Sequence, residues 1–195
     1  MAEKSAGIPH FEELSPKEAG IFRDKIRAAK SSQGANGRSV DVHKVSDYKG
    51  MRTFLTRDGS AGYAVTPAGE LTSVFKHKDS PHGNIAQYAA EHAQVVGGAT
   101  HLSAFDPELP KRYTAGGFTA VAHVPFNPDY KPAGWDMEKQ GKPDVVFMAA
   151  KGKLGEEPKY SQGQGASVDN YDAGMGAADV MARLNKRQFF KKGQL

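Results

Sequence analysis

The chain contains no cysteine, and this absence excludes three kinds of chemistry at once. A disulfide scaffold, a zinc site built on thiolates and a cysteine nucleophile all need that residue. Long apolar runs are missing too, so we expect neither a membrane span nor a signal peptide. These absences favour a cytoplasmic or virion setting, and the spacing of the histidines predicts no metal site.

An excess of one charge is also lacking. The net charge is only +4 over 195 residues, and the last 45 residues hold eight Lys/Arg against five Asp/Glu. A balance this small does not indicate nucleic acid, and instead favours an electrostatic contact between the C-terminal part and a protein partner. The length suits one domain with a sizeable core, and the 22 glycines and 11 prolines predict many turns.

The most informative stretch, residues 70 to 126, alternates short apolar runs with a helical pattern. We predict a strand at 71–76, a turn-rich loop at 77–84, a helix at 85–96, a strand at 100–105, a short helix, and a strand that starts at Phe118. A strand, a helix and a second strand in this order form a βαβ unit, which implies parallel strands joined by a right-handed crossover.

The remaining segments complete a sheet around this unit. A helix is predicted from Ser15 to about Lys30, because a serine, a proline and a glutamate stand at its start in the positions that favour helix initiation. Further strands are predicted at 39–45, 51–57, 60–66 and 144–150, with a hairpin turn at Asp58 and Gly59. The fold class is therefore α/β, with a mixed central sheet of about seven strands and flanking helices.

Three parts follow from this pattern. Residues 1–14 are an N-terminal arm, and residues 15–150 are the folded domain. Residues 151–195 are a polar, glycine-rich linker followed by a basic amphipathic helix from Ala173 to Lys192. This helix either docks on a partner protein or folds back on its own domain.

The loop before the central helix has the composition of an anion site. Lys78 to Asn84 lie between a strand and a helix N-terminus, where unpaired N–H groups and the helix dipole favour a phosphate. Gly83 permits a close approach to the backbone, and Lys76 and His82 add positive charge. An ordinary strand–helix connection is the alternative interpretation, because such loops are common.

The run LSAFDPELPKRYTAGGF makes the comparison more specific. Asp106 stands seven residues before Tyr113, and Tyr113 stands five before Phe118 in the pattern Tyr-x-x-x-Gly-Phe. These spacings, together with the order of elements over residues 13–150, resemble the GNAT superfamily of acyl-CoA N-acyltransferases. The segments GYAVTPAGELTSVF and RYTAGGFTAVAHVPFNPDY resemble most the divergent GNAT-like domains encoded by phages and prophages.

The resemblance implies acetyl-CoA as the acyl donor and an amine as the acceptor. It makes Tyr113 the general acid that protonates the departing thiolate, and it places Asp106 close to the pantetheine arm of the cofactor. The remaining cofactor contacts that it implies are made by backbone groups: Val74, Phe75 and Lys76 pair with the pantetheine arm, and His82, Gly83, Asn84 and Ile85 hold the pyrophosphate.

A transfer to an amine also needs a general base, and no motif identifies it. Glu70, His77 and His101 lie on or beside the predicted central strands, and we assign the role to Glu70. Each of these residues also has an ordinary interpretation, Glu70 as a solvated turn residue and His101 as a partly buried strand residue. Tyr113 could likewise be a core aromatic residue.

Three departures from the family pattern support a second hypothesis. Ser80 stands where the family usually has arginine or glutamine, Ile85 stands at a position usually held by a small residue, and Asp106 replaces an asparagine. The first hypothesis is a phage-encoded acyltransferase that transfers an acetyl group from acetyl-CoA to an amine. The second is a catalytically inactive, virion-associated or structural protein that docks on a partner in a phage particle or host cell through its terminal arms, chiefly residues 151–195.

Overall fold

The computed structural model of the chain describes residues 7–34, 37, 40–151 and 159–192. Its elements, in chain order, are β1 (Phe11–Leu14), the 3-10 turn η1 (Pro16–Glu18), α1 (Ala19–Ser32), α2 (Val45–Lys49), β2 (Arg52–Thr56), β3 (Ala61–Val65), β4 (Leu71–Lys76), α3 (Ile85–His92), the π-helical turn η3 (Ala93–Gly97), β5 (His101–Phe105), α4 (Glu108–Ala115), β6 (Phe118–Val124), the 3-10 turn η4 (Pro128–Tyr130), α5 (Met137–Gln140), β7 (Val145–Ala150), β8 (Ala166–Ser167) and α6 (Tyr171–Lys192).

The strands form two sheets of four strands each. The first has the order β1-β2-β3-β4 and the second β5-β7-β6-β8. The α/β class is therefore confirmed, whereas the prediction of one mixed sheet of about seven strands is wrong. The two sheets separate because β4 and β5 meet only at a parallel bridge between Glu70 and His101, and beyond it they share no ladder within the described residues.

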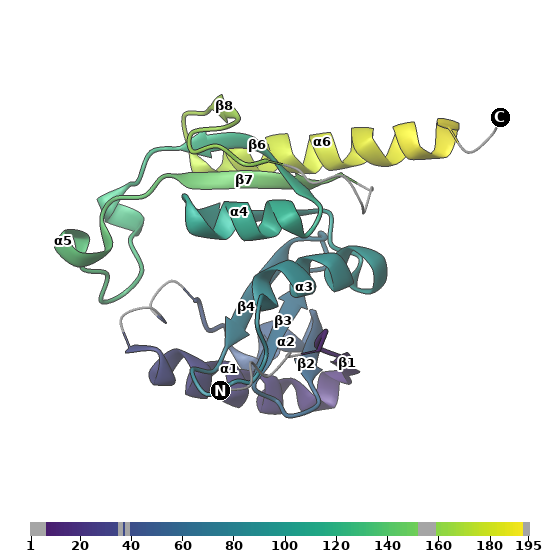
Figure 1. Cartoon of the computed structure of the whole chain (residues 1–195), viewed down its shortest axis with the longest axis vertical. Coiled ribbons are helices and arrows are strands. Elements are labelled where there is room, and N and C mark those ends of the chain that lie inside the picture. Colours follow the sequence, from purple (N-terminus) through teal and green to yellow (C-terminus); the bar gives the residue numbers. More distant parts are fainter. Residues whose placement is uncertain (1–6, 35–36, 38–39, 152–158, 193–195) are drawn as a thin grey trace.

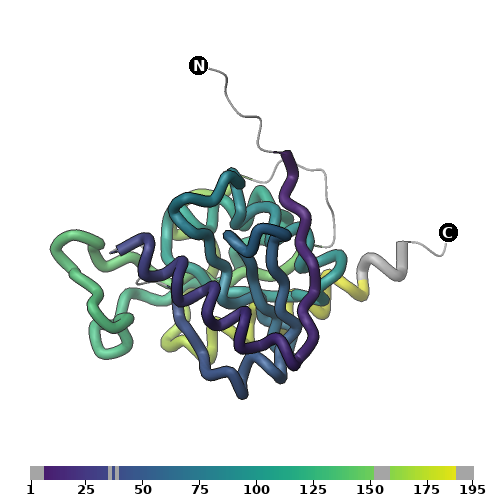
Figure 2. The backbone as a smooth tube through the Cα atoms, turned by 90° about the horizontal axis from the view of Figure 1, so that it is seen from below, coloured from purple at the N-terminus to yellow at the C-terminus, as the bar shows by residue number. Residues whose placement is uncertain are grey.

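The elements stack in five layers (Figure 1): α1 and α2, the first sheet, α3 and α4, the second sheet, and α6. The layer of α3 and α4 lies between the two sheets and contributes to the largest hydrophobic cluster, which we call the central core and which contains Leu71, Ile85, Leu102, Tyr113 and Phe118. The loop that carries α5 extends away from this stack (Figure 2).

The first helix confirms the sequence signal at its start. The backbone N–H and the hydroxyl of Ser15 both donate hydrogen bonds to the Glu18 carboxylate, each over 2.8 Å. From there Phe22 and Ile26 turn one apolar side toward the first sheet, in a second cluster shared with Tyr48 and Phe75. Ser15 thus caps the 3-10 turn η1, which leads into α1 at Ala19, and the helical spacing of the apolar residues determines which side of α1 is buried.

The strand predicted over residues 39–45 is absent from the described part of that segment. Residues 41 to 44 have no regular structure, and α2 begins at Val45. Val40, Val42 and Val45 pack against the cluster beneath α1 instead. The alternating apolar residues of this segment are buried against a helix rather than in a sheet. Periodicity alone cannot distinguish these two kinds of burial.

The terminal parts contribute to both sheets. Phe11–Leu14, which fall in the predicted N-terminal arm, form β1 and pair antiparallel with β2. Residues 166 and 167, in the predicted linker, pair parallel with β6 as β8. The final helix begins at Tyr171, two residues before its predicted start. Residues 1–6, 152–158 and 193–195 of these predicted parts lie outside the described residues.

Close packing of α6 on the second sheet gives a test of this architecture. A Cβ atom added at Gly174 would lie 2.1 Å from the Phe147 ring, whereas one added at Gly176 would have nothing within 4 Å. We therefore expect Gly174→Ala to lower the free energy of unfolding by about 1–3 kcal/mol through overpacking. The matched Gly176→Ala should raise it by about 0.5–1 kcal/mol, since alanine favours a helix. Urea unfolding measures both, and equal effects would contradict this packing.

Candidate functional site

The most distinctive feature of the backbone is the place where β4 and β5 separate, which we call the β4–β5 opening. Glu70 and His101 are bridged in parallel, and the N–H groups of Thr100 and His101 donate to the carbonyl oxygen of Gly69 over 2.8 and 3.3 Å. After this point, among the strands that the structure describes, β4 pairs only with β3 and β5 pairs only with β7. Each of the two strands therefore has one edge that faces the opening and is not paired with another described strand.

An irregularity in β4 determines what faces the opening. Ser73 has a φ of 51°, and the β3–β4 register shifts between Gly62 and Ala64. Beyond it, Val74 packs toward the central core, whereas Phe75 packs in the cluster beneath α1. The Ser73 hydroxyl lies 3.1 Å from that of Tyr48, on the same side as α2.

Of the predicted cofactor contacts on β4, the one at Lys76 is occupied. Its carbonyl oxygen accepts a hydrogen bond from the side-chain amide of Gln33, at the end of α1. A ligand that pairs with the backbone of β4 up to Lys76 has to replace this amide. Among the described residues, no side chain forms such a contact with the backbone of Val74 or Phe75.

Unpaired donors gather where the predicted phosphate loop meets α3. Within the described residues, the N–H groups of residues 83 to 87 donate no hydrogen bond, and the first bond of the helix runs from the Tyr88 N–H to the Asn84 carbonyl over 3.1 Å. Asn84 has a φ of 49°, and its side chain does not cap the helix. Gly83 is exposed, with nothing within 4 Å of the position of a Cβ. This row of donors suits an anion, because the helix dipole adds to it.

The same loop is held by the β2–β3 hairpin turn. His82 Nε2 lies 3.2 Å from Asp58 Oδ2, and the Ser60 and Ser80 hydroxyls lie 2.8 Å apart. Partial burial raises the pKa of Asp58, but hydrogen bonds from Thr56, Ser60 and His82 outweigh it and hold that pKa at about 2. Asp58 therefore stays ionised, and its contact with the His82 ring ties the loop to the hairpin turn.

Tyr113 lies on α4 in the central core. Its side chain is 7% exposed, and its hydroxyl makes no hydrogen bond with a described residue. Burial raises the pKa of Tyr113 above its usual range. The phenol therefore keeps its proton at any physiological pH, as a general acid must before it acts.

Asp106, at the end of β5, already has a partner. The hydroxyl of Tyr160 donates to its carboxylate over 2.7 Å, and the side chain of Asp106 is 7% exposed. Burial, followed by the contact with Asp106, raises the pKa of Tyr160. The predicted contact between Asp106 and a pantetheine arm stays a prediction. The Tyr160 hydroxyl lies beside the Asp106 carboxylate and would be a second polar group next to that arm.

The opposite side of the opening is polar. Ser103, on β5, lies 2.8 Å from the hydroxyl of Tyr171, the first residue of α6. Partial burial raises the pKa of Tyr171, the hydrogen bond with Ser103 lowers it, and the carboxylates of Glu70, Asp41 and Asp172 raise it further. Glu70 is thus close to Tyr171, and burial raises the pKa of Glu70 itself.

The other two candidates for a base differ from Glu70 in their surroundings. His101 is buried, its Nδ1 lies 2.9 Å from the Thr100 hydroxyl, and burial lowers its pKa. His77 lies in the loop after β4, with its Nδ1 3.7 Å from the Asp79 carboxylate. Only Glu70 and His101 lie at the base of the β4–β5 opening.

Sequence reasoning missed several residues of the site, among them Tyr48, Asp58, Tyr160 and Tyr171. Asp58 carried a signal that predicted only the hairpin turn. Tyr160 and Tyr171 are aromatic residues in a stretch of polar and glycine residues, which was the only available hint. Their partners lie 54 and 68 residues away in the chain, so no local pattern connects them.

Two further findings concern the described residues as a whole. Their histidine, aspartate and glutamate side chains form no group of three or more that could hold a metal ion. No helix among them combines the length and the apolar composition that crossing a membrane requires.

No protein-family model matches the chain. No curated protein matches it either. Among solved structures, it is similar to a protein from Rhodopseudomonas palustris described as a GCN5-related N-acetyltransferase and as a class-II aminotransferase. The identity is 9% and the TM-score 0.44, over 76% of this chain and 98% of that one. A likeness of this size carries no argument about activity, which has to come from the site itself.

Proposed function

We propose that the chain is a GNAT-like N-acyltransferase that moves an acetyl group from acetyl-CoA to an amine. The observation that carries the proposal is the β4–β5 opening, where unpaired strand edges lie beside a helix N-terminus with unpaired donors. Pantetheine is peptide-like and can pair with a strand edge, while a pyrophosphate suits N–H groups at the start of a helix.

The residues present fit this ligand at two places. The backbone of Val74, Phe75 and Lys76 would hold the pantetheine arm, with the Gln33 amide replaced at Lys76. The N–H groups from His82 to Ile85 would hold the pyrophosphate, and the open surroundings of Gly83 leave room for it. When bound, acetyl-CoA supplies a thioester whose carbonyl carbon an amine can attack.

The proposed acid and base lie on different sides of the two strands. Tyr113 belongs to the central core with Leu71 and Leu102. Glu70 instead lies close enough to Tyr171, the first residue of α6, for its carboxylate to raise the pKa of Tyr171. A proton has to leave the attacking nitrogen on one side of the carbonyl and reach the departing sulfur on the other. In this arrangement Glu70 accepts the proton from the amine, and Tyr113 donates its proton to the thiolate.

Acetyl-CoA binding to the whole chain, measured by isothermal titration calorimetry, tests the proposal. We expect a saturable heat with a dissociation constant in the micromolar range, on the order of 1–100 μM, typical of enzyme–substrate pairs. No binding at millimolar acetyl-CoA would overturn the proposed function.

The pH dependence of the transfer tests the base. Because burial raises the pKa of Glu70, we expect kcat/KM to fall on acidification at a higher pH than the value of about 4.3 usual for an exposed glutamate. Glu70 is active when deprotonated, so activity is present above its pKa and lost below. Glu70→Gln should lower kcat/KM by about 100-fold and remove this acidic limb.

Steady-state rates between pH 5 and 9 provide that measurement. Glu138→Gln, a neutralised glutamate on α5 far along the chain, serves as the control and should retain both rate and profile. An unchanged acidic limb in Glu70→Gln would assign the base to another group.

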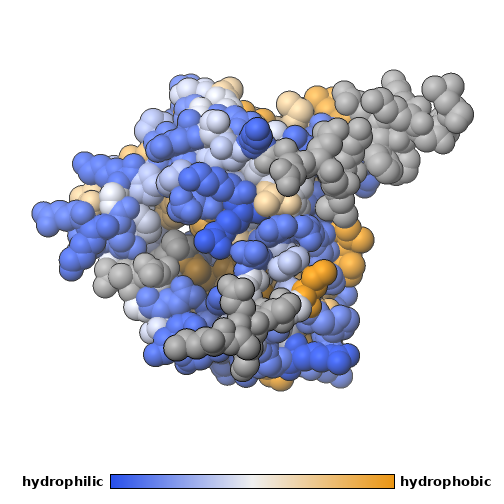
Figure 3. Space-filling view, in the orientation of Figure 1, coloured by the Kyte–Doolittle hydropathy of each residue, from blue (hydrophilic) through white to orange (hydrophobic). Residues whose placement is uncertain are grey.

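A second candidate function is docking on a partner protein without catalysis. The observation in its favour is that large apolar side chains on α6 are exposed, among them Val180, Met181 and Leu184 by 56%, 39% and 46%. The helix runs along the second sheet and past its edge (Figure 1), and apolar atoms gather over it at the upper right of Figure 3. Retention of one stoichiometric partner from a bacterial lysate by the wild type, lost in Leu184→Glu, would support it. A monomer with unchanged behaviour in Leu184→Glu would overturn it.

A further inference from the structure

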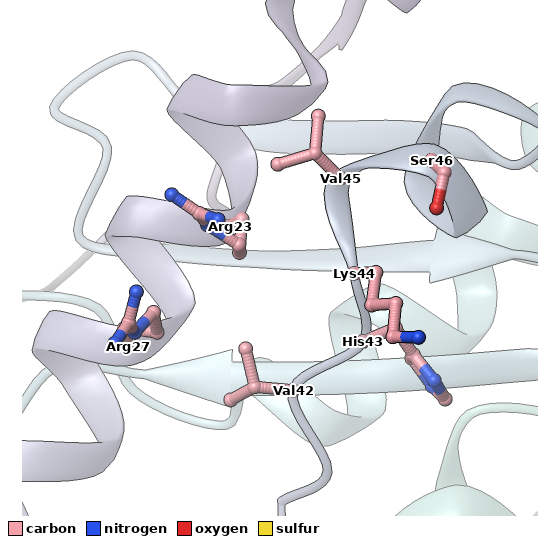
Figure 4. A pocket seen from close by; sticks show the side chains of 7 residues that line it. All are labelled: Arg23, Arg27, Val42, His43, Lys44, Val45 and Ser46. Carbon is pink, nitrogen blue, oxygen red and sulfur yellow. The ribbon is translucent and has the colours of Figure 1, made fainter.

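A pocket of about 420 Å³ lies outside the β4–β5 opening, between α1 and the segment that leads into α2. Figure 4 shows Arg23 and Arg27 on the helix side and His43 and Lys44 on the facing segment. Its volume falls in the range of small-molecule sites.

The residues that line the pocket carry positive charge, and no carboxylate is among them. Arg27 and Lys44 make no ion pair with another described residue, and Arg23 pairs over 3.0 Å only with Asp24, its neighbour on α1. The Asp47 carboxylate, which follows Lys44, is turned to the Lys44 backbone N–H at 3.2 Å.

Two arginines and a lysine define the kind of ligand. A guanidinium offers donors in a planar fork that matches the oxygens of a carboxylate or a phosphate. Val42 and Val45 add apolar surface to the lining. The pocket therefore suits the anionic end of a small organic molecule rather than a bare ion.

Hydrogen bonds connect this pocket to the β4–β5 opening. The backbone N–H of His43 donates to the Tyr48 hydroxyl over 3.2 Å, and that hydroxyl lies 3.1 Å from the hydroxyl of Ser73. The His43 ring also packs edge-on against the Tyr48 ring, 5.5 Å between centroids. One wall of the pocket is thus fixed two hydrogen bonds away from the middle of β4.

We propose that this pocket holds an anionic group of the acceptor, so that the acceptor is an amine that also carries a carboxylate or a phosphate. The proposal rests on the proposed function. It places the anion between α1 and Lys44 and the amine at the opening, on the side of Glu70.

Titration of the isotope-labelled chain with inorganic phosphate and with acetate, followed by NMR, tests the pocket without acetyl-CoA. We expect saturable shifts in Arg27, His43 and Lys44, and the anion with the higher affinity identifies the acceptor's group. Arg27→Gln and Lys44→Gln should each weaken binding by about tenfold, as for a lost hydrogen bond to a charged group. Arg187→Gln, which removes an exposed arginine on α6, should have no effect.

Two outcomes of this titration would overturn the proposal that the pocket binds an anionic group. One is no saturation, and the other is an equal loss in Arg187→Gln, which would mean attraction to net charge alone. Because acetyl-CoA binding is measured separately, and should persist in Arg27→Gln, a failed pocket and a failed acyltransferase are distinguished.

Matched amines then test the link to the acceptor, in the presence of CoA. We expect an amine with its carboxylate at the far end of an extended chain, such as 8-aminooctanoate, to bind about tenfold more tightly than the neutral 8-aminooctanamide, with the difference abolished in Arg27→Gln. The amide signals of Glu70 and Ser73 should shift along with those of the pocket. Equal affinities within this pair, or shifts confined to the pocket, would overturn the role in acceptor binding.

Discussion

Replacing Gly83 by glutamate should abolish acetyl-CoA binding while leaving the fold intact. A side chain fits there without strain, because nothing lies within 4 Å of the added Cβ and the glycine does not adopt a positive φ. The new carboxylate would stand among the unpaired N–H groups, where the pyrophosphate is proposed to lie. Two like charges about 4 Å apart near a protein surface repel by about 4 kcal/mol, so we expect affinity to fall by at least about 100-fold.

Isothermal titration calorimetry compares this variant with the wild type. Gly176→Glu is the matched control, because it adds the same charge at an exposed glycine with equally open surroundings. Circular dichroism confirms that both variants are folded. Retained affinity in Gly83→Glu would mean that the pyrophosphate does not bind at the loop before α3.

Removal of the Tyr113 hydroxyl should slow the transfer strongly. We expect Tyr113→Phe to lower kcat by about 100- to 1,000-fold with little change in KM, because a general acid acts in the transition state. The ring stays in the central core, and no hydrogen bond to a described residue is lost, so stability should be preserved. Since the pKa of Tyr113 is raised, the wild type should show no loss of activity from this group up to about pH 10.

Tyr88→Phe is the control for this substitution, because Tyr88 is a partly buried tyrosine on α3 packed against the same core. It should leave kcat unchanged. Thermal unfolding confirms that both variants are folded, and steady-state kinetics give the rates. Equal rates in Tyr113→Phe and the wild type would mean that Tyr113 is a core aromatic residue only.

Much of the local structure was predictable because its signals lie within a few residues. The run from Leu71 to Lys76 is bounded by turn residues and forms β4 with the predicted ends. Asp58 and Gly59 form the predicted hairpin turn, where Gly59 has a φ of +65° and the Thr56 hydroxyl donates to Asp58 over 2.6 Å. The start of α3 at Ile85 also follows from the loop before it.

The division into two sheets was not predictable, because it depends on packing. Whether β4 and β5 continue to pair after Glu70 depends on how α3 and α4 fill the space between the sheets. Gly116 illustrates the fit, since a Cβ there would lie 2.5 Å from the Cβ of Ala90 on α3. Sequence spacing carries no information on such a contact between neighbouring helices.

The candidate site was predictable in part for the same reason. The loop residues from His82 to Ile85 follow one another in the chain. The His82 N–H donates to the Ser80 hydroxyl over 3.3 Å, and the N–H groups of Gly83, Asn84 and Ile85 donate to no described residue. Tyr171, by contrast, meets Ser103 only because α6 folds back across the second sheet. A stretch of glycine and polar residues predicted a linker there, although Tyr160 and Tyr171 within it contribute side chains to the site.

The short strand β8 has a consequence for behaviour at high concentration. Without it, the outer edge of β6 would present unpaired backbone groups to other molecules, which is how edge strands initiate aggregation. Ala166 and Ser167 cover that edge with only two residues, too few to offer a new template. Gly165 makes the approach possible, because a Cβ there would lie 2.8 Å from the backbone of β6. A residue with a side chain at position 165 would therefore uncover the edge and favour self-association of the folded chain.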